Sequence, residues 1–169
     1  MSPHAESIRM RLSGGPLSAR QLSESMGISQ PTMSRALTDL GDDIVRIGAA
    51  RSIRYALRDA ARGLPDIAIY RVDAEGRIKL LGTLVPVRSE GFVMRQTDGV
   101  TRYSEGLPWW LSDMRPQCYL GRAHAARHGA ELGLPARLAD WSDTHALRAL
   151  LAHGHDLVGN LLPGDVARN

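Results

Sequence analysis

The sequence has a single cysteine and no long apolar segment, and these two absences narrow the class of protein. With Cys118 alone no intramolecular disulfide can form, and one thiol fits a reducing compartment. No run reaches the roughly 18 uncharged apolar residues of a membrane-spanning helix. The N-terminal segment MSPHAESIRMRL lacks the hydrophobic core of a signal peptide. We therefore expect a cytoplasmic protein, whose 169 residues suffice for one large or two small domains.

Charged residues are unevenly distributed along the chain. Residues 1–62 contain nine Arg and six acids, a net charge of +3. Residues 63–169 contain eleven Arg and one Lys against twelve acids, a net charge of zero. The whole excess of the protein, +3, thus lies in its N-terminal segment. An excess confined to one segment indicates a nucleic-acid partner for that segment.

The stretch of residues 17–40 predicts two short helices joined by a tight turn. Ser18 followed by Gln21 is a capping box, so the first helix should cover residues 19–26. Gly27 supplies the left-handed backbone that such a turn needs. A helical hairpin inside an ordinary core is the alternative interpretation.

The second helix of this stretch is amphipathic. Ser29 caps it, and Pro31 is tolerated in its first turn because no N–H partner is required there. One face forms a buried stripe of Met33, Leu37 and Leu40. The opposite face carries donors and a forked cation, which suit the major groove of DNA: Gln30, Thr32, Ser34, Arg35 and Thr38.

Residues 44–58, IVRIGAARSIRYALR, predict two strands around a turn near residues 48–50. Together with a first helix over residues 4–12, this gives a winged helix-turn-helix DNA-binding domain at residues 1–60. A wing contacts phosphates through basic side chains, here Arg46, Arg51 and Arg54. The alternative for these three arginines is the solvated rim of a hairpin.

The polar segment 59–66, DAARGLPD, predicts a domain boundary. Beyond it, residues 66–104 show a period of two in strand-like segments separated by DAEG, RSEG and TDG turns, which predicts a small antiparallel sheet. Residues 107–153 read as helices and residues 154–169 as a truncated end. The expected fold class is α+β, with a winged helix-turn-helix before a second domain of sheet and C-terminal helices at residues 66–169.

Four blocks of the chain, in their order and spacing, carry a family resemblance. They are SQPTMSRALTDLGDDIVRIGAARSIRYALRD, GTLVPV, YSEGLPWWLSDMRPQCYLGR and ALLAHGHDLVGNLLPGD. The last two look like an F-x-E-G-L-L-P-E turn and an L-L-x-x-x-G-x-D-x-x-G segment. The chain thereby resembles the HipA-like serine/threonine kinase toxins, most closely their YjjJ-type branch. The resemblance implies a winged helix-turn-helix followed by the N-terminal subdomain of the kinase.

The resemblance also implies what this chain lacks. The family's ATP-binding lobe and its catalytic and magnesium-binding aspartates lie further on, so we expect no kinase activity and no cofactor. A free-standing subdomain is similar to the small antitoxin subunit of tripartite HipA-type systems, which docks onto its kinase. The residues expected to bind such a partner are Trp109, Trp110, Leu161 and Leu162. Core packing is the alternative for the two tryptophans.

Three enzyme-like patterns lack a required residue. Segment 154–159, GHDLVG, has the glycine spacing of a phosphate loop, but Asn-Leu follows it instead of Lys and Ser or Thr. His124 and His128 have the spacing of a zinc pair, but no third ligand is placed, so we interpret them as solvated surface histidines. Cys118 has no obvious base partner.

The sequence therefore predicts a bacterial DNA-binding transcriptional regulator of toxin–antitoxin type, without catalytic residues or bound metal. One winged domain reads only a short half-site of double-stranded DNA, so specificity favours a homodimer. The alternative is the N-terminal fragment, or an antitoxin-like partner, of a HipA-type kinase.

Overall fold

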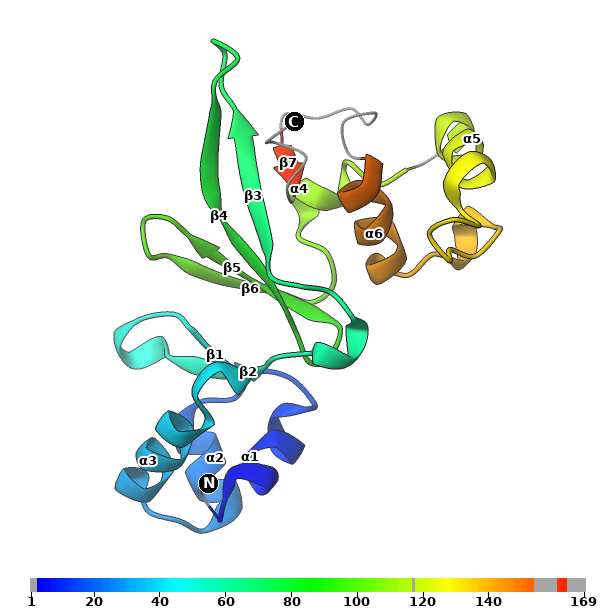
Figure 1. Cartoon of the computed structure of the whole chain (residues 1–169). Helices are drawn as coiled ribbons and strands as arrows, with labels where there is room; N and C mark the ends of the chain where they lie inside the picture. Colours follow the sequence, from blue (N-terminus) through cyan, green and yellow to red (C-terminus); the bar gives the residue numbers. More distant parts are fainter. Residues whose placement is uncertain (1–2, 117, 154–160, 164–169) are drawn as a thin grey trace. The chain divides into compact units, whose positions relative to one another are not determined.

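The computed structural model describes residues 3–116, 118–153 and 161–163 (Figure 1). It confirms an α+β protein with antiparallel strand pairs. The chain forms two compact units, Met1–Asp66 with Leu84–Glu105, and Ile67–Thr83 with Gly106–Asn169. Among the described residues, no helix is both long and apolar enough to cross a membrane.

The first unit begins with three helices and a two-stranded hairpin. The helices are α1 (Ala5–Leu12), α2 (Ala19–Met26) and α3 (Gln30–Leu40), and the antiparallel strands are β1 (Ile44–Ile47) and β2 (Arg54–Leu57). Each helix and strand predicted for this segment is present. Their shared core is apolar and largely inaccessible to water: Ala5, Ile8, Leu12, Leu22, Met33, Ala36, Leu37, Leu40 and Ile44.

Within the described residues, a five-stranded sheet and three further α-helices follow. The strands are β3 (Ile67–Val72), β4 (Ile78–Val87), β5 (Gly91–Gln96), β6 (Thr101–Ser104) and β7 (Leu161–Pro163), in the order β6-β5-β4-β3-β7. The helices are α4 (Trp109–Ser112), α5 (Cys118–His128) and α6 (Asp143–His153). The four strands predicted at residues 66–104 are confirmed. Strand β7 was not predicted, because its three residues are too few to show a period.

The hairpin of β1 and β2 is covered on both faces. Ile44, Tyr55 and Leu57 pack with the helices. The other face joins a second core formed by Val45, Ile47, Ala56, Val85, Val87 and Val93, with Tyr103 packed against it. The last residue of β2 also bonds to the residue that follows β4, since Arg88 N–H donates to the Leu57 carbonyl at 2.8 Å. Residues 84–105 therefore belong to the first compact unit.

The compact units do not follow the predicted domains at residues 1–60 and 66–169. Strand β4 is divided between them, with residues 78–83 in the second unit and residues 84–87 in the first. The reason is the second core, in which apolar residues of β4 and β5 bury one face of the hairpin. A domain boundary at residues 59–66 stays a prediction.

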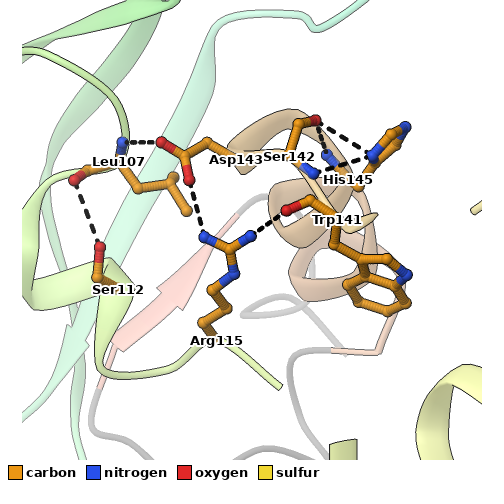
Figure 2. A network of polar contacts seen from close by, with 7 residues as sticks. All are labelled: Leu107, Ser112, Arg115, Trp141, Ser142, Asp143 and His145. Atoms are coloured by element: carbon orange, nitrogen blue, oxygen red, sulfur yellow. Dashed lines mark hydrogen bonds and ion pairs between the residues drawn. The ribbon is translucent and has the colours of Figure 1, made fainter. Parts of the chain in front are cut away.

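In the second unit a polar network holds the start of α6 (Figure 2). Asp143 accepts hydrogen bonds from the backbone N–H of Leu107 at 2.8 Å and from Arg115 at 2.9 Å. Arg115 also donates to the carbonyl of Trp141. Ser142 Oγ accepts from the backbone N–H of His145 at 3.3 Å, so the serine caps the N-terminus of this helix. One carboxylate thus joins α6 to the segment before α4.

Candidate nucleic-acid interface

The turn between α2 and α3 has the geometry that its residues predict. Ser18 accepts from the backbone N–H of Gln21, and the Gln21 side chain accepts from Ser18 N–H at 2.9 Å, which completes the capping box. Gly27 has φ +63°, a left-handed conformation that costs a side-chain-bearing residue about 1–2 kcal/mol. Ile28 packs against the helical core and closes the angle between the helices.

Helix α3 presents a polar face to solvent. Ser29 caps its N-terminus, and Met33, Leu37 and Leu40 are buried as predicted. On the opposite face Gln30, Ser34, Arg35 and Thr38 are exposed, whereas Thr32 is half-buried.

Two hydroxyls of that face are already engaged within the protein. Thr32 Oγ1 lies 2.9 Å from Ser29 Oγ, and Thr38 Oγ1 donates to the Ser34 carbonyl at 3.0 Å. The side chains of Gln30, Ser34 and Arg35 make no hydrogen bond or ion pair among the described residues. These three are therefore the members of the face whose polar groups are entirely unengaged.

The three hairpin arginines lie at the turn but on different faces. Arg46 is opposite Tyr55 and shares the face that packs on the helices, while Arg54 is opposite Ile47 on the face that packs on β4–β6. Arg51 lies in the turn itself, within the short helical segment Ala50–Ser52. All three are exposed. The sequence did not indicate that a sheet lies on the Arg54 side of the hairpin.

The partner of Arg54 is aromatic. Its guanidinium carbon lies 5.9 Å from the ring centroid of Tyr103 on β6, a cation–π distance. Burial is the main cause that raises the pKa of Tyr103 above its ordinary value, and the charge of Glu105 adds to it, whereas Arg54 lowers it. The phenol is therefore neutral at physiological pH, and it orients Arg54 without neutralising its charge.

Ion pairing separates the arginines of the first unit into two groups. Several are neutralised by nearby acids: Arg9 by Glu6 and Asp43, Arg20 by Glu24, Arg58 by Asp66 and Arg88 by Asp59. Arg11 and Arg62 donate to backbone carbonyls. In contrast, within the described part of the chain Arg35, Arg46 and Arg51 have no hydrogen bond or ion pair, and Arg54 has only its contact with Tyr103. The four arginines predicted to contact DNA all keep an uncompensated charge.

Ser23 departs from the small apolar residue that usually packs between such helices. A serine fits at this position if its hydroxyl bonds back to the Ala19 carbonyl. That condition is not met, since Ser23 is 6% exposed and its Oγ has no hydrogen-bond partner among the described residues. A buried hydroxyl without a partner is destabilising.

The predicted partner-binding residues lie in the second unit. Trp109 on α4 is 77% exposed, whereas its neighbour Trp110 is half-buried. Leu161 and Leu162 have a described backbone in β7, where they are opposite Arg71 and Tyr70 of β3, but their side chains lie outside the described part of the chain. The predicted role in partner binding stays a prediction.

Three histidines come together, of which the sequence indicated two. His124 and His128 of α5 have ring centroids 5.1 Å apart, and His153 at the end of α6 lies 5.5 Å and 4.0 Å from them. All three are half-buried, so the interpretation of the first two as solvated surface histidines is wrong. Among the described residues no group of three or more His, Cys, Asp or Glu side chains is arranged to hold a metal ion. The segment 154–159 and the Cys118 side chain lie outside the described residues.

Fold and surface together define an α+β protein whose N-terminal helices and hairpin carry unpaired arginines. Comparison with known proteins gives its family. Residues 64–169 match the family described as YjjJ-like toxin, middle domain. Over 152 residues, 89% of the chain, it is 36% identical to Toxin YjjJ of Escherichia coli (strain K12). The chain belongs to the YjjJ-like toxin family.

The match covers most of this chain but only part of the relative. The chain spans about a third of the length of Toxin YjjJ, 34%. No solved structure matches the chain.

Proposed function

We propose that residues 1–60 form a winged helix-turn-helix and that the protein is a DNA-binding transcriptional regulator of toxin–antitoxin type. The observation that carries this proposal is the pattern of ion pairs in the first unit. Arg35, Arg46, Arg51 and Arg54 have no acidic partner among the described residues, although acids neutralise other arginines of the same unit. Uncompensated arginines on a helix face and its adjoining hairpin are what a phosphate-rich partner requires.

Helix α3 enters the major groove in this proposal. Its exposed Gln30 and Arg35 are long enough for two parallel hydrogen bonds to a base edge, Gln to adenine and Arg to guanine. Ser34, also exposed, assists them. Thr32 and Thr38 have hydroxyls engaged in local hydrogen bonds, so they support the helix more than they read bases.

The hairpin arginines bind the phosphate backbone and orient α3. Such contacts carry no sequence information, but they set the dependence of binding on salt. Arg46, Arg51 and Arg54 together correspond to a slope of log K against log salt of about −3 per protomer. A homodimer on a pseudo-palindromic operator doubles the contacts and supplies the specificity that one half-site lacks.

Fluorescence anisotropy with a labelled duplex from upstream of the protein's own gene tests the proposal. Wild-type protein is compared with Arg35→Ala and with Arg127→Ala, an exposed arginine of α5 in the second unit. We expect Arg35→Ala to cost about 1–3 kcal/mol on this duplex, which is a loss of roughly 5- to 150-fold in affinity. Arg127→Ala should bind like wild type. Binding of the wild type no tighter than to random DNA overturns the regulator proposal.

A second candidate function is that of a partner, or N-terminal part, of a HipA-type kinase, with no catalysis by these residues. The observation that favours it is the exposed indole of Trp109, because large apolar side chains at 77% exposure are typical of interface anchors. Calorimetric titration with the part of the Escherichia coli relative that this chain does not span tests it. Trp109→Ala should weaken binding at least tenfold, whereas Met10→Ala, exposed on α1, should not.

Two outcomes contradict this second function. One is the absence of measurable binding by the wild type, and the other is equal binding by wild type and Trp109→Ala. The lack of catalysis is tested separately with radiolabelled ATP. Phosphate transfer to the protein or to a general substrate above the rate without protein overturns it.

A further inference from the structure

Strands β5 and β6 have two faces that differ in their neighbours. Residues opposite one another in an antiparallel pair point to the same face of the sheet. Val93 is opposite Tyr103, and both pack against the hairpin of β1 and β2. Arg95 is opposite Thr101, two residues further along each strand, so both belong to this same face.

Arg95 therefore lies next to the turn of the hairpin. Thr101 Oγ1 accepts a 2.6 Å hydrogen bond from the backbone N–H of Gly48, where that turn begins. The turn contains Arg51. Arg54 contacts Tyr103, which is two residues after Thr101 on β6. In Figure 1 the turn between β1 and β2, the turn between β5 and β6, and α3 all lie at the left edge of the drawing. Arg95 thus lies on the side of the hairpin that carries Arg54, close to the turn that contains Arg51.

The charge of Arg95 is uncompensated. It is exposed and, within the described residues, has no hydrogen bond or ion pair. The nearest acid in the sequence is Asp98 in the β5–β6 turn, whose Oδ1 accepts from the backbone N–H of Val100 at 2.9 Å. Arg58 and Arg88 of the same unit are paired with acids. Arg95, like the four arginines predicted to bind DNA, has no acidic partner among the described residues.

We propose that Arg95 is a further phosphate-binding residue, so that the DNA interface continues from the hairpin onto β5 of the central sheet. This inference rests on the proposed DNA-binding function. The hydrogen bond from Gly48 to Thr101 and the core beneath Tyr103 hold the two surfaces together, so one stretch of backbone phosphates meets both. A phosphate contact adds affinity equally on every DNA sequence.

Arg102 provides a matched control on the same pair of strands. It is exposed and also has no partner among the described residues. It is opposite Met94, and it alternates along β6 with Thr101 and Tyr103, so it points to the other face of the sheet. Arg95→Ala and Arg102→Ala each remove one positive charge from this pair of neighbouring strands, but from opposite faces of the sheet.

The experiment measures binding of wild type, Arg95→Ala, Arg102→Ala and Arg35→Ala to the upstream duplex and to a random duplex from 50 to 300 mM salt. We expect Arg95→Ala to reduce the salt slope by about 0.9 and to weaken binding by the same factor on both duplexes. Arg102→Ala should keep the wild-type slope. Arg35→Ala should weaken binding to the upstream duplex more than to the random one.

The outcomes distinguish a failure of the proposed Arg95 contact from a failure of the proposed DNA binding. If Arg35→Ala weakens specific binding but Arg95→Ala keeps the wild-type slope, the contact at Arg95 is wrong while DNA binding stands. If Arg102→Ala lowers the slope as much as Arg95→Ala, net charge and not position is responsible, and the inference is again overturned. If the wild type binds neither duplex, both proposals fail. Equal urea midpoints for all four proteins establish that folding is intact.

Discussion

The backbone N–H of Gly48 donates a 2.6 Å hydrogen bond to Oγ1 of Thr101, a residue 53 positions later in the chain. This bond attaches the turn of the β1–β2 hairpin to strand β6. Two residues further on, Tyr103 packs against the core that includes Val45 and Ile47 of β1, and the guanidinium of Arg54 lies over its ring. The hairpin that carries the proposed phosphate contacts is thus held by the sheet as well as by the helices.

Replacing Thr101 with valine removes the acceptor and keeps the side-chain shape. The Gly48 N–H then loses its partner, so we expect the free energy of unfolding to fall by about 1 kcal/mol. The Gly48 amide should also exchange with deuterium faster, because the turn opens locally. Urea unfolding and amide exchange by NMR measure the two effects. Thr101→Ser keeps the hydroxyl and should resemble wild type, and an unchanged Gly48 exchange rate in Thr101→Val contradicts the prediction.

Ser23→Ala should stabilise the protein. The Ser23 hydroxyl is buried on α2 without a hydrogen-bond partner among the described residues, and alanine also has the higher helix propensity. We expect a gain of about 1 kcal/mol in urea unfolding. Ser25→Ala is the control on the same helix, because Ser25 accepts from Arg11 at 2.8 Å and donates to the Leu22 carbonyl at 3.0 Å. A loss of stability in Ser23→Ala would show that its hydroxyl has a partner.

Asp143→Asn weakens the network at the start of α6. The carboxylate accepts from Leu107 N–H and from Arg115, and both Asp143 and Arg115 have side chains about one-third exposed, 33% and 29%. Loss of the charge-assisted bonds should cost about 1–3 kcal/mol in chemical unfolding. Asp140→Asn should cost below about 1 kcal/mol, since its pair with Arg137 is exposed and 3.8 Å long. Equal losses in the two variants rule out a special role for Asp143.

Asp73 makes the β3–β4 hairpin sensitive to acid. Its hydrogen bonds to Lys79 and to the backbone of Arg77 hold its pKa well below the ordinary value of 3.8. The folded state therefore binds a proton less readily than the unfolded chain, and the stabilisation is complete above pH 3.8 and is lost as the pH falls through the folded pKa.

The urea midpoints of wild type and Asp73→Asn should accordingly differ by a constant amount between pH 7 and pH 5, and the difference should shrink as the pH falls below 3.8. Glu75→Gln is the control in the same turn. Glu75 lies 3.0 Å from Arg77 and is 64% exposed. A gap between wild type and Asp73→Asn that persists unchanged at pH 2.5 contradicts the assignment.

Local signals predicted most of the secondary structure of the first unit. The cap at Ser18, the left-handed Gly27 and the cap at Ser29 act within a few residues, so their effect is legible in sequence. The two strands of the hairpin were likewise predicted from a local pattern. That pattern did not show that both faces of the hairpin are covered, because the second cover comes from residues 84–105, beyond the polar segment that suggested a boundary.

In the candidate site, too, some residues could be predicted from local sequence and others depend on contacts between distant segments. Arg35, Arg46 and Arg51 stood out because they lie on a helix face or in a turn, and the structure places them on the surface without partners among the described residues. Arg95 and Tyr103 carried no such signal, since each is an ordinary member of an alternating strand. His153 joins His124 and His128 only through the packing of α5 with α6. Such contacts join segments that are far apart in the chain, and they leave no periodic pattern in a single sequence from which they could be predicted.

The sequence by itself determined the α+β class, the two helices joined at Gly27 and the excess of positive charge in the N-terminal segment, because caps, periods and charges act locally or add up along the chain. Only the tertiary structure decided which arginines keep an uncompensated charge and that the hairpin is anchored to β6 through Gly48 and Thr101. Ion pairs and buried faces form between residues far apart in the chain, and the folded backbone alone brings them within a few ångströms.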